Sequence, residues 1–280
     1  MTRAHSPADL SVALELLGAE GSEAIAVAGC TDLMAADHAS GVVRPEVVDI
    51  SRLPELRDIE LKDGWLDMGA ATTFSELRRH ELVREHFPIL AEVAGTIGGW
   101  QIQNRATLGG NIANASPAGD SLPVLLALDA ELVLASSDGQ RKVRYSDMHR
   151  GYRKTKLRTG ELITRVRLPI PRRNMAQVFR KVGTREAQAI SKVVIAFTVD
   201  VEEGRMHHAR IAAGSVAAMP VRLRKAEKAC EGKVLDVATA DEVAAIARSE
   251  VKPIDDVRST GVYRSHIVER IVRRMIINLG

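Results

Sequence analysis

Aromatic residues and cysteines are scarce in this chain of 280 residues. Phe, Trp and Tyr together make up 3% of the sequence, so the core must consist mainly of Val, Ile, Leu and Ala. The only cysteines, Cys30 and Cys230, lie 200 residues apart, a spacing that provides neither a disulfide framework nor a cysteine-based metal motif. An iron–sulfur cluster usually takes four cysteines, so this chain cannot hold one alone. Free thiols are typical of a reducing compartment, and we expect a cytoplasmic protein.

Long apolar runs are also missing. The first residues contain no apolar stretch of the kind found in secretory signals. The longest apolar run, residues 122–135, is interrupted by Asp129 and Glu131. A membrane-spanning helix needs about 20 consecutive apolar residues, so the sequence predicts no membrane span.

Charge of one sign is not in large excess. The formal net charge is +3 at pH 7, which argues against a protein that binds nucleic acid by charge. One basic cluster stands out, but no run of aromatic residues alternates with it in a pattern typical of base stacking. We interpret it as solvated surface or as a surface that faces another protein. Its residues are Arg150, Arg153, Lys154, Lys156 and Arg158.

The pattern of strands and helices changes at residues 169–173, where Pro169 and Pro171 close a strand. Before this boundary we expect two α/β subdomains, at about residues 1–54 and 55–171. The first is a βαβ-type unit whose opening helix, residues 8–17, has Ser6 as its N-cap. In the second, Thr73 caps a helix over residues 74–80.

Beyond the boundary the pattern predicts a small α+β domain, residues 172–280. Strands alternate there with short turns and are followed by helices, which favours an antiparallel sheet rather than a parallel one. The three strands are expected at residues 177–182, 193–202 and 207–214, and the helices at residues 220–231, 239–251 and 263–277.

The most informative segment is residues 104–120, which carries almost no large apolar side chain. Gly109 and Gly110 let the backbone approach a ligand closely or take a positive φ, and their N–H groups can face an anion. Thr107 and Asn111 flank the pair, and Asp120 can accept hydrogen bonds from sugar or ribityl hydroxyls. The segment predicts a loop that wraps a phosphorylated, hydroxyl-rich ligand; the alternative is a surface loop rich in turn residues.

A second candidate element is the turn between a short strand, residues 24–28, and a helix, residues 33–38. The N–H groups of residues 29–32 can cradle a pyrophosphate at the start of that helix. No G-x-G-x-x-G string is present, so a Rossmann site is unsupported. A dinucleotide offers one pyrophosphate and two sugar-like arms, which suits two separate loops.

Other reactive residue types have simpler interpretations. Cys30 at a helix start is interpreted as a small side chain in a crowded turn rather than a nucleophile. His207 and His208 are adjacent in a strand, so they point to opposite faces and are not expected to chelate one metal. Asp255 and Asp256 are interpreted as a turn before a helix. No metal site is predicted.

Together these motifs resemble a known family. The chain is similar to the FAD-binding (medium) subunit of the molybdenum hydroxylases, which include xanthine dehydrogenase, carbon-monoxide dehydrogenase and related hydroxylases of N-heterocycles or aldehydes. The match covers nearly the whole chain, and the motifs follow the family's order. They are residues 28–33, 101–111, 116–120, 151–155, 160–163, 179–183, 190–192 and 253–260.

The resemblance implies an α+β chain with a PCMH-like FAD-binding fold of two α/β subdomains in residues 1–171, followed by the small α+β domain. It also implies which residues contact the cofactor. The pyrophosphate and its surroundings would be held by Ala26, Val27, Ala28, Gly29, Cys30, Thr31, Asp32 and Leu33 and by Thr107, Leu108, Gly109, Gly110 and Asn111. The flavin would be lined by Ile97, Asp120, Ile163 and Lys181.

Lys181 is the residue that the resemblance offers for tuning the flavin. Near the isoalloxazine ring its ammonium group would stabilise the anionic reduced ring, so Lys181→Met is expected to lower the flavin potential.

Two positions depart from the family pattern. Cys30 and Ala106 stand where the family usually has glycine, and a side chain disfavours positive φ at both. The cysteine-bearing loop that holds an extra iron–sulfur cluster in some relatives is missing here. We expect FAD binding to survive both substitutions.

The implied function is electron transfer within a larger complex. A large subunit would carry the molybdenum cofactor, and a small subunit would carry [2Fe–2S] clusters that pass electrons to FAD on this chain. NAD+ or another acceptor would then receive them, and the assembly is expected to be a dimer of heterotrimers. Two alternatives stay open: a self-contained flavin oxidase, and a non-catalytic partner that has lost FAD.

Overall fold

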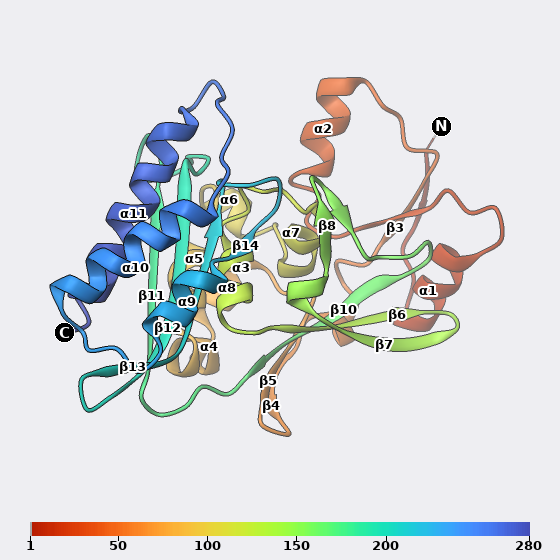
Figure 1. Cartoon of the computed structure of the whole chain (residues 1–280). Coiled ribbons are helices and arrows are strands. Elements are labelled where there is room, and N and C mark those ends of the chain that lie inside the picture. Colours follow the sequence, from red (N-terminus) through yellow and green to blue (C-terminus); the bar gives the residue numbers. More distant parts are fainter. Residues whose placement is uncertain (1) are drawn as a thin grey trace.

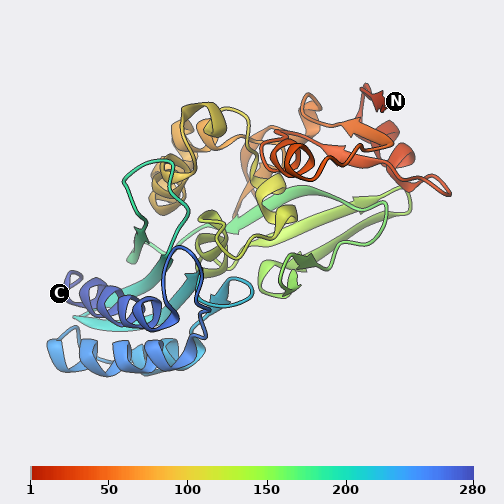
Figure 2. The same ribbon diagram turned by 90° about the horizontal axis from the view of Figure 1, so that it is seen from above.

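The computed structural model describes residues 2–280, which contain three hydrophobic cores and three larger β-sheets. The N-terminal part lies at one end of the molecule and the C-terminal part at the other, with the second sheet between them (Figures 1 and 2). The expected α+β chain, with α/β subdomains before a smaller α+β unit, is confirmed.

The first unit is a three-stranded parallel sheet in the order β1-β3-β2. Its strands are β1 (Arg3–His5), β2 (Ile25–Val27) and β3 (Glu46–Asp49), and its helices are α1 (Leu10–Gly18) and α2 (Leu33–Ser40). The predicted N-cap Ser6 is wrong. Asp9 is the N-cap, because its carboxylate accepts a hydrogen bond from the N–H of Val12 at 3.0 Å, so the helix begins two residues later than expected.

The second unit is a five-stranded antiparallel sheet in the order β4-β5-β10-β6-β7. Residues 54–56 form a 3-10 turn (η1), and β4 begins after it at Ile59. Thr73 caps α3 as predicted, in a reciprocal capping box with Glu76. The strands are β4 (Ile59–Lys62), β5 (Trp65–Gly69), β6 (Glu131–Ser136), β7 (Gly139–Arg144) and β10 (Leu162–Pro169).

Six helices lie between β5 and β6, and the large second core packs under them. They are α3 (Phe74–Arg79), α4 (Glu81–His86), α5 (Pro88–Thr96), α6 (Trp100–Gln103), α7 (Leu108–Asn114) and α8 (Ser121–Ala127). After β7 the chain forms a 3-10 turn, η2 (Tyr145–Asp147), and a two-stranded hairpin of β8 (His149–Gly151) and β9 (Lys154–Thr155).

The third unit is an antiparallel sheet with four strands, not the predicted three. The fourth, β14 (Val221–Arg222), is two residues long and leaves no periodic pattern to recognise. The others are β11 (Met175–Val182), β12 (Val193–Glu202) and β13 (Arg205–Gly214). Helices α9 (Arg224–Cys230), α10 (Val237–Glu250) and α11 (Gly261–Ile277) lie along this sheet (Figures 1 and 2).

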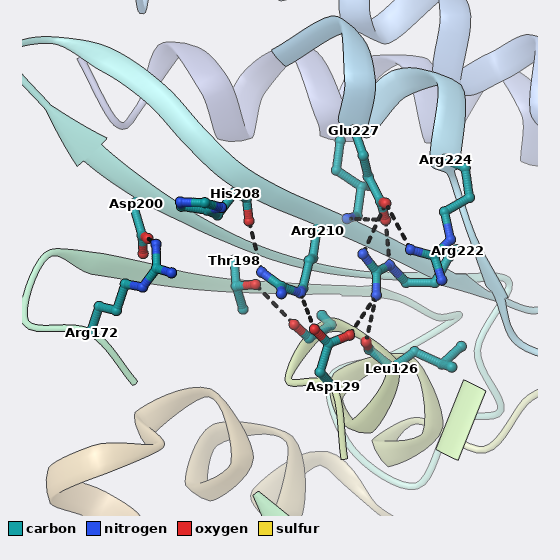
Figure 3. Close-up of polar contacts among 12 residues, drawn as sticks. Leu126, Asp129, Arg172, Thr198, Asp200, His208, Arg210, Arg222, Arg224 and Glu227 are labelled. Carbon is teal, nitrogen blue, oxygen red and sulfur yellow. Dashed lines mark hydrogen bonds and ion pairs between the residues drawn. The ribbon is translucent and has the colours of Figure 1, made fainter. Parts of the chain in front are cut away.

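The third sheet is joined to the end of α8 by polar contacts (Figure 3). Thr198 donates its hydroxyl hydrogen to the carbonyl of Ala127 at 2.9 Å. Arg222 donates to the carbonyl of Leu126 at 3.2 Å and to Asp129 at 2.8 Å. These donors satisfy carbonyls at the helix C-terminus, where a cation is also favoured by the helix dipole. The C-terminal sheet is therefore attached to the second unit at a defined position.

Arg222 also forms a buried ion pair with Glu227, and both side chains are less than one-tenth exposed. Arg222→Ala leaves the carboxylate buried without its main partner, and we expect a loss of about 3 kcal/mol in the free energy of unfolding. Arg224→Ala is the matched control, because Arg224 is exposed and 3.6 Å from the same carboxylate. We expect less than about 1 kcal/mol for it. Urea unfolding measures both, and equal losses would contradict the assignment.

Candidate functional site

The turn after β2 has a run of unused backbone donors. No acceptor within residues 2–280 receives a hydrogen bond from the N–H groups of residues 29–33, and Asp32 makes no side-chain cap at the start of α2. Cys30 adopts φ 59°, the left-handed conformation, which turns the chain from the strand into the helix. Unused N–H groups at a helix N-terminus favour an anion, as the sequence predicts for this turn.

The turn at residues 29–33 is here called the first motif, and residues 104–120 are called the second motif. The second motif contains the start of a helix at Thr107 rather than a loop, which corrects the prediction. Thr107 is the N-cap of α7 and accepts a hydrogen bond from the N–H of Gly110 at 3.1 Å. The N–H of Gly109 donates to the carbonyl of Ala70 at 2.8 Å, and that of Asn111 donates to the carbonyl of Thr107 at 3.0 Å. Because these donors already have acceptors in the protein, they do not face an anion as predicted.

Gly109 and Gly110 allow close packing, not positive φ. Neither has a left-handed backbone. A Cβ on Gly109 would lie 2.7 Å from the Cβ of Ala70, and one on Gly110 would lie 2.8 Å from the hydroxyl oxygen of Thr107. The glycine pair therefore lets α7 begin directly against the end of β5.

The two motifs touch through their backbones. A Cβ on Gly29 would lie 2.0 Å from the carbonyl oxygen of Arg105 and 2.9 Å from the Cα of Ala106. Only glycine fits at this position without displacing one motif from the other. Ala106 is buried and does not have a positive φ, so its departure from the family's glycine needs no strained conformation, whereas Cys30 does adopt one.

A cavity of about 420 Å³ reaches both motifs, since Gly29 and Thr107 are among its lining residues. Its walls carry guanidinium groups that our sequence analysis did not single out. Arg57 is paired with Glu76, whereas the other three arginines have no carboxylate partner within residues 2–280. The additional polar lining residues are Ser51, Arg52, Arg57, Thr73, Ser75, Glu76, Arg79, Asn104 and Arg105.

Three of the four residues predicted to line the flavin, Ile97, Asp120 and Lys181, meet at a second point. The Lys181 ammonium donates to the carbonyl of Thr96 at 2.9 Å and to Asp120 at 2.6 Å, and Ser191 donates to the other oxygen of Asp120. Ile97 directly follows Thr96. Lys181 and Asp120 are both less than one-tenth exposed. Burial raises the pKa of Asp120, and the Lys181 ammonium and the Ser191 hydroxyl oppose that rise.

Ile163 lies elsewhere, within the second hydrophobic core, and is 4% exposed. It is paired with Leu134 across β10 and β6, beside an irregularity in the register at residues 163–165. Thr164, the next residue, accepts a hydrogen bond from the N–H of Ala70 at 3.0 Å. The strand therefore brings Ile163 near the start of α7, although its side chain forms part of the core.

The remaining candidates have partners within the protein. His207 bonds to Glu231 at 3.0 Å, and Asp255 accepts a hydrogen bond from the N–H of Gly261 at 2.6 Å. Within residues 2–280, no group of three or more His, Cys, Asp or Glu side chains is placed to hold a metal ion. No helix in that range is both long and apolar enough to cross a membrane.

Comparison with known proteins finds family matches along nearly the whole chain. The family of the FAD binding domain in molybdopterin dehydrogenase matches residues 1–171, and that of the CO dehydrogenase flavoprotein C-terminal domain matches residues 178–279. The chain belongs to this family of FAD-binding subunits. It is therefore a subunit of an oxidoreductase, and its own cofactor is FAD.

The relatives are similar over almost their entire lengths. The xanthine dehydrogenase FAD-binding subunit of Escherichia coli O157:H7 is 32% identical over 97% of this chain and 94% of its own. The structure of carbon monoxide dehydrogenase from Hydrogenophaga pseudoflava superposes with a TM-score of 0.94 at 28% identity, over 98% of this chain and 95% of the other. Quinoline 2-oxidoreductase from Pseudomonas putida 86 superposes with a TM-score of 0.93 at 28% identity, over 99% and 96%.

The residues present fit the phosphate end of this family's cofactor. The consecutive unused N–H groups of residues 29–33 offer hydrogen-bond donors to a pyrophosphate, and the unpaired arginines of the neighbouring cavity offer positive charge. Gly29 keeps the space between the two motifs free of a side chain.

If the backbone at Cys30 is strained, replacing Cys30 and Ala106 with glycine should change the free energy of unfolding in opposite directions. We expect Cys30→Gly to raise the free energy of unfolding by up to about 1 kcal/mol, because a left-handed residue other than glycine is strained. We expect Ala106→Gly to lower it by about 0.5–1 kcal/mol, because no positive φ is present there to relieve. Urea unfolding measures both changes. A loss of stability in both variants would show that Cys30 is not strained.

Proposed function

We propose that this chain is the electron-transfer subunit of a molybdenum hydroxylase complex, with residues 1–171 as the FAD-binding domain and residues 172–280 as the C-terminal α+β domain. The run of unused N–H groups at residues 29–33 carries this proposal, because it is a donor set that a pyrophosphate satisfies. FAD, when bound, takes up electrons singly and releases them in pairs.

The two motifs have different roles in binding the cofactor. The turn at residues 29–33 donates to the phosphates, and Arg105, which precedes Ala106 and Thr107, adds positive charge from the other side of the Gly29 contact. The N–H groups of α7 are used in the protein, so its role is to place the exposed Gly110 and the side chain of Asn111 beside the ligand. Asn111 is held there by a hydrogen bond from Ser121 at 2.8 Å.

Lys181 and Asp120 form an ion pair at the flavin end of the proposed site. The pair joins β11 of the third unit to the start of α8 in the second, so the site includes both parts of the chain. Because Asp120 neutralises Lys181, the ammonium acts on its surroundings as half of a dipole rather than as a lone charge. Ile97 contributes an apolar wall next to the carbonyl that Lys181 contacts.

The names of the relatives support separate partners for the rest of the chemistry. The relatives in Escherichia coli and Hydrogenophaga pseudoflava are named as an FAD-binding subunit and a medium chain. We place the molybdenum cofactor on a large subunit and the [2Fe–2S] clusters on a small one, since two cysteines cannot supply the usual four cluster ligands. The assembly is proposed to be cytoplasmic and to pair two heterotrimers.

Charge at the flavin end sets the flavin potential in this account. Lys181→Met removes the cation and leaves Asp120 buried, so we expect the potential of the bound flavin to fall. Lys181→Met combined with Asp120→Asn removes both charges, and the potential is expected to recover most of the difference. Potentiometric titration of the FAD-loaded variants measures this cycle. An unchanged potential in the single variant would place Lys181 away from the flavin.

The proposed acceptor, NAD+, is tested with the FAD-loaded chain alone. Anaerobic NADH is expected to bleach the visible flavin band, because hydride transfer is reversible. Photoreduction is the control that shows the flavin can be reduced. Bleaching by light but not by NADH would exclude NAD+ and leave another acceptor. Bleaching by the chemically reduced [2Fe–2S] subunit tests the electron-donor side in the same way.

A further inference from the structure

A hairpin carries the whole positive excess of this chain. The segment from Arg144 to Arg158, here called the basic hairpin, contains six basic residues and one acidic residue, Asp147. Its net charge is therefore +5, against +3 for the complete chain, so the remainder is net −2. Lys156 is half-buried and the other five cations are exposed; the six are Arg144, Arg150, Arg153, Lys154, Lys156 and Arg158.

The charges of the basic hairpin are not neutralised within residues 2–280, because none of its six cations lies within ion-pair distance of a carboxylate there. The neighbouring strands differ sharply. Arg141 in β7 pairs with Glu161, and Arg165 in β10 pairs with Asp58 and Asp67. Like charges gathered without counter-charges repel one another and create a strong local positive potential. Such a surface suits a partner that brings the missing negative charge.

The tip of the hairpin has the side chains of a protein contact. Tyr152 is 62% exposed, and the Arg153 guanidinium lies 6.0 Å from the centre of its ring. Tyrosine and arginine are among the residues that contribute most to binding at protein interfaces. Arg153 has φ 51°, so a left-handed turn presents these two side chains at the end of the hairpin.

The hairpin is fixed beside the cofactor motif. Arg153 donates to the side-chain oxygen of Asn114 at 2.8 Å, and Asn114 is the last residue of α7, the helix that starts at Thr107. At its base, His149 is buried and bonds to the hydroxyl of Tyr145 at 2.9 Å. Figure 1 shows β8 next to α7. A partner on the hairpin is therefore held next to the helix of the second motif.

We propose that the basic hairpin is the docking surface for an acidic face of the subunit that delivers electrons to this chain. This inference rests on the proposed electron-transfer function. The net charge of −2 on the remainder of the chain disfavours a long polyanion or a flat anionic membrane, because both would extend beyond the hairpin. A compact acidic face contacts the hairpin alone, and complementary charge speeds its association.

The test reverses the charge of three hairpin residues and leaves Arg153 unchanged. Arg150→Glu, Lys154→Glu and Lys156→Glu are combined, and Arg153 is kept because it contacts Asn114. The matched control is Lys225→Glu, Lys252→Glu and Arg270→Glu, three exposed cations of the C-terminal unit without carboxylate partners in residues 2–280. Each chain is produced together with the [2Fe–2S] and molybdenum-cofactor subunits of its own organism. Subunit ratio, association rate at low and high salt, and FAD per chain are measured.

Reversal of the hairpin is expected to slow association with the [2Fe–2S] subunit about tenfold or more at low salt, and to remove the salt dependence shown by the wild type. FAD per chain should equal that of the wild type, and the control triple should behave as the wild type in all three measurements.

Three outcomes would overturn the proposal. The first is wild-type association and salt dependence in the hairpin triple, including the case where only binding to duplex DNA or phosphatidylserine vesicles is lost. The second is loss of FAD from the hairpin triple, which would assign the hairpin to the cofactor site. The third is equal weakening by the control triple. Absence of FAD from the wild-type complex would instead count against the proposed function. The subunit ratio would still test the docking surface in that case.

Discussion

The contact between Gly29 and Arg105 is the constraint on which the cofactor site depends. A Cβ at Gly29 would lie 2.0 Å from a carbonyl oxygen, so the first and second motifs can meet only because this position has no side chain. The contact joins the parallel sheet of the first unit to the helices of the second. It fixes the turn with unused N–H groups at a set distance from Thr107 and the start of α7.

The site also needs the third unit. Lys181 reaches from β11 to Asp120 and to the carbonyl of Thr96, while Thr198 and Arg222 attach the same sheet to the end of α8. Contacts at both ends of α8 therefore hold the C-terminal sheet against the FAD-binding part. The basic hairpin lies outside this frame but is tied to it through Asn114. The same packed elements therefore position both the proposed cofactor site and the proposed partner surface.

Strong local patterns in the sequence predicted much of the fold. The Thr73 cap and the long apolar strand at residues 193–202 formed as expected, because the signals that start or end them lie within a few residues. Ser6 was predicted as the cap because it precedes Pro7 and the apolar pattern, and only the structure shows that Asp9 makes the capping bond. The two-residue β14 is defined by its neighbours in the sheet and has no pattern of its own.

The candidate site was predicted less completely, for physical reasons. Glycine is unfavourable in helices, so Gly109 and Gly110 indicated a loop, yet close packing on Ala70 places them in the first turn of α7. The turn at residues 29–33 was found because its strand–glycine–helix order is local. Arg52, Arg57 and Arg79 were missed because only the folded chain brings them beside Gly29. The pairing of Asp120 with Lys181 joins residues 61 positions apart, which spacing alone does not reveal.

The flavin content of the purified chain tests the central claim most directly. The chain is incubated with FAD and desalted, and the retained flavin is extracted, identified and counted, both alone and in complex with its partner subunits. This account predicts about one FAD per chain, because the unused N–H groups and arginines form a donor set for one pyrophosphate. No retained FAD in the assembled complex would contradict it and favour a non-catalytic partner that has kept the fold.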